Sequence, residues 1–86
     1  MFEFAVARGT NYVHDVYIAR IDYPGQRVVL IVKNNHQELT YHLPLGVVIT
    51  INGEPSRLGK LRKGMRVISY TEADAKDLSQ LDVRPK

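Results

Sequence analysis

The stretch RVVLIVKNNHQELTYHL, residues 27–43, decides the fold class. Its first part is rich in β-branched residues, its last part alternates apolar and polar residues, and the turn-forming NNHQ lies between them. If Lys33 pairs with Glu38 across that turn, the apolar residues of both parts share one face: Val28, Leu30, Val32, Leu39, Tyr41 and Leu43. A slip of one residue would set them against polar or outward residues, so the pattern predicts an antiparallel hairpin with this core face.

The preceding segment NYVHDVYIARIDY, residues 11–23, predicts another strand of the same sheet. Simple alternation places three of its residues on the core face: Tyr17, Ala19 and Ile21. Because Pro24-Gly25 suits a two-residue hairpin poorly, we expect a longer loop or a bulge there. The opposite face then holds an outer row that is too apolar for open solvent: Val16, Ile18, Val29 and Ile31.

Downstream, INGEPSRLGKLRKGMRVISY (residues 51–70) predicts a connector that leads into a strand. Asn52-Gly53 tolerates the positive φ of a tight turn, and Ser56 is a natural N-cap. The three-residue spacing of Leu58 and Leu61 predicts one inward-facing helical turn within residues 56–61. We interpret the cations of this connector as a solvated surface in preference to a phosphate site.

These segments predict one domain, over residues 1–86, with an all-β fold. Further strands are expected at FEFAV, VVITI, MRVISYT and LSQLDV. We predict a small antiparallel barrel of five or six strands with one short helical turn. The order of elements is that of an OB-fold, with ELTYHLPLGVVITI as a long third strand bent at Pro44-Gly46, and an SH3-like barrel is the alternative.

The second half of the chain resembles a family of small bacterial β-barrel domains of unknown function. The likeness extends over about residues 16–83 and rests on a strand, an NG turn with a small connector, and a following strand: Thr50, Ile51, Asn52, Gly53, Leu58, Leu61, Lys63, Gly64, Met65, Val67 and Tyr70, with Ala75, Leu81 and Val83 towards the end. The resemblance implies an OB-like barrel and supplies no catalytic residues.

Composition restricts the chemistry that the chain can perform. The absence of cysteine excludes disulfides, thiolate metal sites and cysteine nucleophiles. The spacing of His14, His36 and His42 matches no metal motif, and no serine has an evident base beside it in the sequence. We therefore expect a protein without cofactor or metal that is not an enzyme. The start of the chain lacks a signal peptide and no stretch is long enough to span a membrane, so we expect a cytoplasmic protein.

Two functions fit these features. The favoured one is a non-catalytic protein-interaction or assembly module, a homo-oligomer or a binder of another protein, whose interface comprises Phe2, Phe4, Val6, Val16, Ile18, Val29 and Ile31. The alternative is single-stranded nucleic-acid binding by an OB-like strand face and the basic connector, that is by Arg57, Lys60, Arg62, Lys63 and Arg66. The acidic loop TEADAKD, residues 71–77, and the net charge of only +3 argue against the alternative.

Overall fold

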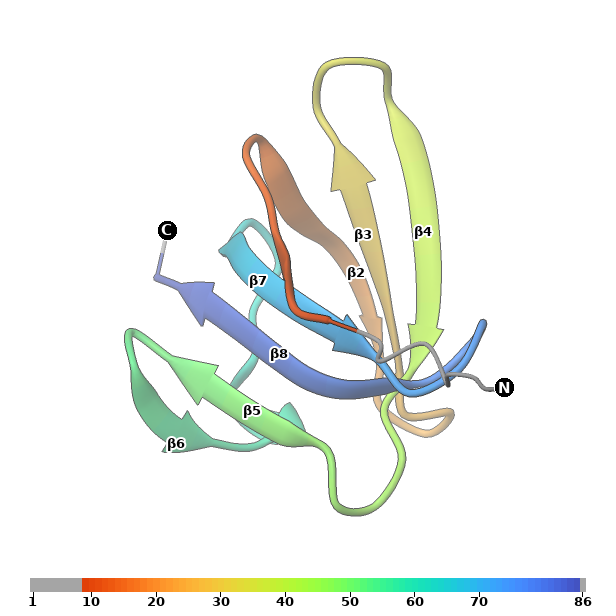
Figure 1. The fold of residues 1–86 in the computed structure, drawn as a ribbon, viewed down its shortest axis with the longest axis vertical. Coiled ribbons are helices and arrows are strands. Elements are labelled where there is room, and N and C mark those ends of the chain that lie inside the picture. Colours follow the sequence, from red (N-terminus) through yellow and green to blue (C-terminus); the bar gives the residue numbers. More distant parts are fainter. Residues whose placement is uncertain (1–8, 86) are drawn as a thin grey trace, which may run out of the picture.

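The computed structural model describes residues 9–85, in which all strands belong to one eight-stranded sheet (Figure 1). The expected strand around Phe2, Phe4 and Val6 lies outside the described residues. The elements are β1 Asn11–Tyr12, β2 Val16–Asp22, β3 Arg27–Val32, β4 Gln37–His42, β5 Val48–Ile51, β6 Glu54–Ser56, the 3₁₀ turn η1 Leu58–Lys60, β7 Arg66–Glu72 and β8 Leu78–Arg84. The prediction of an all-β fold with one short helical turn is confirmed.

The predicted closed barrel of five or six strands is wrong. Pairing follows an open path, β4-β3-β2-β7-β8-β5-β6, with β1 paired to β7. The neighbours are antiparallel except β5 and β8, which run parallel. The expected long third strand is divided into β4 and β5, because Pro44 lacks an N–H to donate and Gly46 has a φ of +90°. A single parallel bridge, His42 to Asp77, is the contact that brings the end of β4 to the start of β8.

The β3–β4 hairpin has the predicted faces in a different register. Leu30 lies opposite Leu39 and Ile31 opposite Glu38, a shift of two residues from the predicted pairing. Since side chains alternate with a period of two, a shift of two leaves the same residues facing the core. The four-residue turn sets this register: His36 adopts a φ of +58° and its N–H donates to the Val32 carbonyl.

A β-bulge at Ala19 changes the faces of β2. Ile21 lies opposite Val28 as predicted, but beyond the bulge Ile18 lies opposite Leu30. The extra residue turns Val16 and Ile18 into the core and Tyr17 outwards. The prediction that Tyr17 faces the core and that Val16 and Ile18 belong to an outer row is therefore wrong. Tyr23–Gln26 forms the longer loop expected between β2 and β3.

The connector between β5 and β7 is structural. Asn52 and Gly53 have φ values of +56° and +83°, so the tight turn between β5 and β6 is confirmed. The helical turn at Leu58–Lys60 is confirmed too, but Ser56 ends β6 and makes no cap; the N-cap position belongs to Arg57. Leu61 is fully buried and Leu58 packs against the core.

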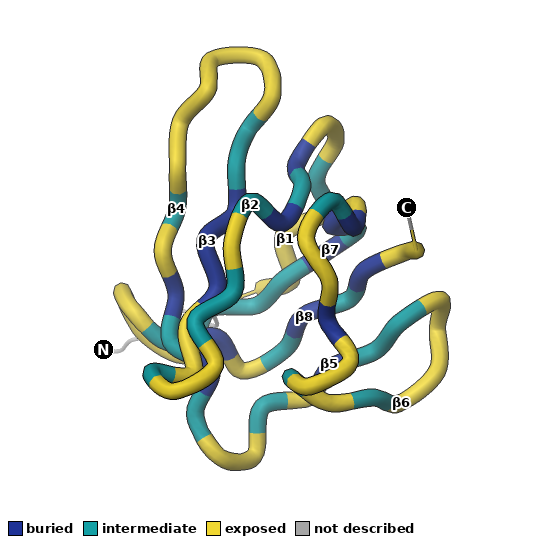
Figure 2. Tube along the Cα trace, turned by 180° about the vertical axis from the view of Figure 1, so that it is seen from behind, coloured by how far each residue is buried: buried dark blue, intermediate teal, exposed yellow. Residues whose placement is uncertain are grey.

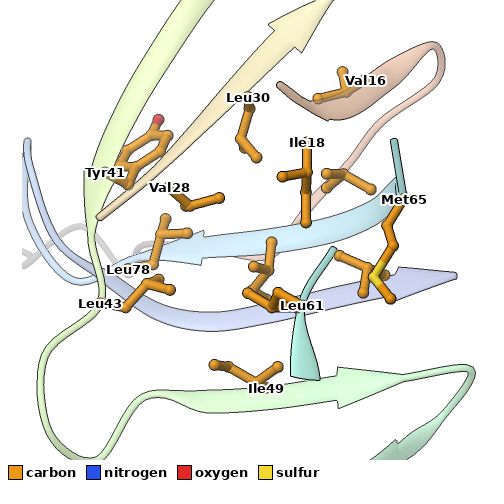
Figure 3. Packing of buried hydrophobic residues seen from close by; sticks show 13 residues of the cluster. Val16, Ile18, Val28, Leu30, Tyr41, Leu43, Ile49, Leu61, Met65 and Leu78 are labelled. Carbon is orange, nitrogen blue, oxygen red and sulfur yellow. The ribbon is translucent and has the colours of Figure 1, made fainter. Parts of the chain in front are cut away.

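The core lies inside the curl of the sheet (Figures 2 and 3). It draws on β2, β3, β4, β5, β7, β8 and the loops beside them: Val16, Ile18, Val28, Leu30, Tyr41, Leu43, Ile49, Leu61, Met65, Val67, Leu78, Leu81 and Val83. Burial of these side chains, at about 1.5–3 kcal/mol for each large one, is what holds together a chain with no disulfide.

Candidate binding surfaces

The basic connector does not form one continuous cationic track. Arg57 and Lys60 line a hollow of about 410 Å³ together with Pro55 and Ser56. The Arg62 guanidinium donates to the Gly59 carbonyl at 2.9 Å and to the Leu61 carbonyl at 2.8 Å. Those bonds satisfy carbonyls at the end of η1, so Arg62 has a structural role.

Arg66 lies apart from those residues, at the start of β7, where it is opposite Tyr17 of β2 and Arg84 of β8. Lys63 is exposed in the loop that precedes β7. The adjacent Gly64 donates its N–H to the Ile18 carbonyl at 2.8 Å, which fixes this loop beside β2. Arg66 is thus the cross-strand neighbour of Tyr17 and the loop of Lys63 lies beside β2, while neither residue lines the hollow at Arg57.

The outer face around Tyr17 is one candidate surface. A hollow of about 380 Å³ there is lined by Tyr17, Ile31, Lys33, His36 and Gly64. The Lys33 Nζ lies 5.2 Å from the centre of the Tyr17 ring, within the range of a cation–π contact. An aromatic ring, an aliphatic side chain and an exposed cation therefore line the same hollow.

Sequence reasoning placed Tyr17 in the core and missed this surface, although a signal was present. The large aliphatic residues of β2 are Val16, Ile18 and Ile21, and the spacing changes from two residues to three before Ile21. Such a change of phase within a strand is what a one-residue bulge produces.

The free edge of β4 is the second candidate surface. β4 pairs with β3 along its length, and on its other side the only backbone pairing within residues 9–85 is that of His42 with the 73–77 loop. The His42 N–H points to that other side and donates to the Lys76 carbonyl at 2.7 Å, whereas the Leu43 N–H donates towards β3, to Gln26. By alternation, the N–H groups of Glu38 and Thr40 point the same way as that of His42, away from β3.

The side chains of this edge are mixed. Glu38 and Thr40 are exposed on the outer face, and Figure 2 shows that much of β4 is exposed. Leu39, on the inner face, is only partly buried, as is Val32 next to the same turn. The free edge is therefore bordered by apolar surface that a further strand would cover.

The lower end of β4 is fastened to the 73–77 loop. The His42 Nδ1 lies 3.1 Å from the Asp77 Oδ1, beside a hollow of about 380 Å³ that Arg27, Thr40 and Lys76 also line. This contact limits the free edge to the upper part of β4, Gln37–Tyr41.

Two further polar contacts are structural. The Tyr41 hydroxyl donates to the Glu72 Oε2 at 2.5 Å, and burial together with this bond raises the pKa of Tyr41 above its ordinary value. In the β2–β3 loop, the hydrogen bond from Arg27 to Asp22 at 2.9 Å, with one from the Gly25 N–H, lowers the pKa of Asp22. The first contact links β4 to the end of β7, which are not neighbours in the sheet, and the second closes the loop between β2 and β3.

Within residues 9–85 we see no cluster of side chains suited to catalysis or to metal binding. No group of three or more His, Asp or Glu side chains in that range could hold a metal ion. The Ser69 hydroxyl accepts from the Gln80 amide, and that of Ser79 donates to the Thr71 carbonyl. No helix of the described chain is both long and apolar enough to cross a membrane.

Comparison with known proteins supplies no relative from which a function of these surfaces could be inferred. No family model, curated protein or solved structure matches the chain. The resemblance to small bacterial β-barrel domains stays a prediction.

Proposed function

We propose that this protein is a non-catalytic assembly module that accepts an extended segment of a partner protein along the free edge of β4. The observation that carries the proposal is the outward direction of the Glu38 and Thr40 N–H groups on a strand that ends the pairing path. Unpaired backbone groups in a row are a template for a further strand.

The faces of β4 define the chemistry of the segment. A strand added beside Gln37–Tyr41 would continue both faces of the sheet. Its inward side chains would be apolar, since they would lie next to Leu39 and Tyr41, and its outward ones polar, next to Glu38 and Thr40. A segment with alternating apolar residues is required.

The chain itself contains such a pattern. In the sequence, Phe2, Phe4 and Val6 alternate with Glu3 and Ala5. We therefore propose that the segment is residues 1–8 of a second copy, which makes the protein a homo-oligomer. Of the other expected interface residues, Ile31 and Val29 are on the outer face, where Val29 is already buried, while Val16 and Ile18 are buried in the core.

The mass in solution, measured by light scattering over a range of concentrations, tests this proposal. We expect an oligomer for the full chain and a monomer for Thr40→Pro, because proline removes one outward N–H without loss of a bond to β3. Thr40→Ala is the matched control and retains the mass. A monomer at high micromolar concentration would contradict self-assembly.

Deletion of residues 1–8 then identifies the segment. We expect the truncated protein to be monomeric and to bind a peptide of residues 1–8, but not a scrambled peptide of the same composition. If the truncated protein has the same number of subunits as the full chain while Thr40→Pro is a monomer, two copies of β4 pair with each other and the N-terminal segment has no part in assembly.

A further inference from the structure

The outer face around Tyr17 has properties that strand addition at β4 does not use. The ring of Tyr17 points outwards because of the bulge at Ala19, and it borders a hollow on the outer face of β2 and β3. The contacts described for this ring are the cation–π contact with Lys33 and the neighbouring Ile31 and Gly64.

Four cations belong to the segments next to Tyr17. Arg66 is its cross-strand neighbour on β7, and Arg84 is the neighbour of Arg66 on β8. Lys33 lies over the ring, and Lys63 precedes Gly64 in the loop that borders the hollow. Adjacent strands are about 4.8 Å apart, so two arginines and a tyrosine form a row across three strands.

Three acids lie on the same face. Glu38 pairs with Arg20 at 3.4 Å, so these two charges offset each other. Asp15 is exposed in the turn before β2, and Asp82 accepts from the neutral Thr50 hydroxyl at 2.6 Å and keeps its charge. Four cations against these two acids leave the surroundings of Tyr17 with a net positive charge.

The acidic loop at residues 71–77 is too far away to cancel this charge. Arg66 begins β7 and Glu72 ends it, and the strand has seven residues. At about 3.3 Å per residue the acids of the loop lie roughly 20 Å from Arg66, which exceeds the screening length of about 8 Å at physiological salt. Contrary to the expectation from the sequence, the acidic loop therefore does not offset the positive charge around Tyr17.

We infer that this face binds a single-stranded nucleic acid. A base stacks on the Tyr17 ring in place of the Lys33 ammonium, and the phosphates on either side contact Lys33 and Arg66, with Lys63 and Arg84 further along. The exposed ring favours a single strand over a duplex, since the bases of a duplex are already stacked on each other. The inference does not depend on the proposed assembly, which uses the backbone edge of β4.

The test is a fluorescence titration of the full protein with labelled oligothymidylate and oligouridylate. Four phosphate contacts give a slope of log affinity against log salt of about −2.8, so affinity falls roughly 50-fold between about 50 and about 200 mM salt. Tyr17→Leu weakens binding by about fivefold or more through loss of stacking, whereas Tyr17→Phe, which keeps the ring, retains it.

Two double variants with equal changes of charge locate the site. Lys33→Gln with Arg66→Gln reduces the salt slope by about 1.4, because two phosphate contacts are lost. Arg57→Gln with Lys60→Gln removes the same charge beside the other hollow and leaves the slope unchanged. Thr40→Pro, which prevents strand addition, leaves the affinity for nucleic acid unchanged.

Several results would overturn the inference. These are no binding at about 50 mM salt, an equal loss in the Arg57 and Lys60 control, and an unaltered affinity of Tyr17→Leu. Equal affinity for a duplex would remove the stacking role of Tyr17, and equal affinity for polyglutamate would identify an acidic polypeptide as the ligand instead.

Discussion

Replacement of Ile18 by alanine examines the bulge that determines both faces of β2. Ile18 is 1% exposed, between Leu30 of β3 and the loop of Gly64. Removal of three buried carbons at about 0.8 kcal/mol each costs about 2.4 kcal/mol, and the cavity left behind raises the total loss to about 3–4 kcal/mol. Ile31→Ala, on the partly exposed outer face of β3, is the matched control and should cost less than about 1.5 kcal/mol.

Urea denaturation followed by circular dichroism measures both free energies of unfolding. With a slope of roughly 1–1.5 kcal/mol per molar urea for so small a chain, Ile18→Ala should lower the midpoint by about 2–4 M. If β2 alternated without interruption, Ile18 would share the outer face with Ile31 and the two variants would behave alike. A loss under about 1 kcal/mol for Ile18→Ala would refute the bulge, and with it the outward position of Tyr17.

Three other predictions concern the connector, the turns and the core. In urea titrations, Leu61→Ala should lower the free energy of unfolding by about 3 kcal/mol, whereas glutamine at Arg57, Lys60 or Lys63 should change it by under about 0.5 kcal/mol each. Larger losses for the glutamine variants than for Leu61→Ala would show that the connector is not structural. Gly53→Ala should cost about 1–2 kcal/mol because its φ is +83°, while Gly59→Ala, in η1 with open space around it, should cost nothing; equal effects would argue against the positive φ. Because the pKa of Tyr41 is raised, the contribution of Tyr41 to stability is complete below the ordinary tyrosine pKa of 10.0 and is lost as the pH rises above it. The difference in tyrosinate absorbance between wild type and Tyr41→Phe should therefore appear only when the protein unfolds, and a difference in the folded protein would contradict the hydrogen bond to Glu72.

The faces of the β3–β4 hairpin could be predicted from the sequence because they depend only on a period of two. The register could not, since residues 33–36 and residues 34–37 each supply a four-residue turn, and the choice between them depends on His36 at a positive φ. The tight turn at Asn52-Gly53 and the helical turn near Leu58 were predictable from local chemistry alone.

The candidate surfaces were harder to predict because each depends on one irregularity. The bulge at Ala19 reverses the faces of Tyr17 and Ile18, and alternation applied without a break assigns both wrongly. The free edge of β4 follows from the division of the expected third strand at Pro44 and Gly46, which leaves the pairing path open. Closure of a sheet depends on long-range pairing, which the local pattern does not specify.

Amide hydrogen exchange at Glu38 and Thr40 tests the proposed assembly most directly. In dilute solution, where the protein is monomeric, both N–H groups should exchange rapidly while those of Leu39 and Tyr41, which point towards β3, are protected. At concentrations that give the oligomer, we expect Glu38 and Thr40 to become protected as well, because a partner strand then accepts their hydrogen bonds. Rapid exchange of both amides in the oligomer, or protection of both in the monomer, would contradict strand addition at the edge of β4.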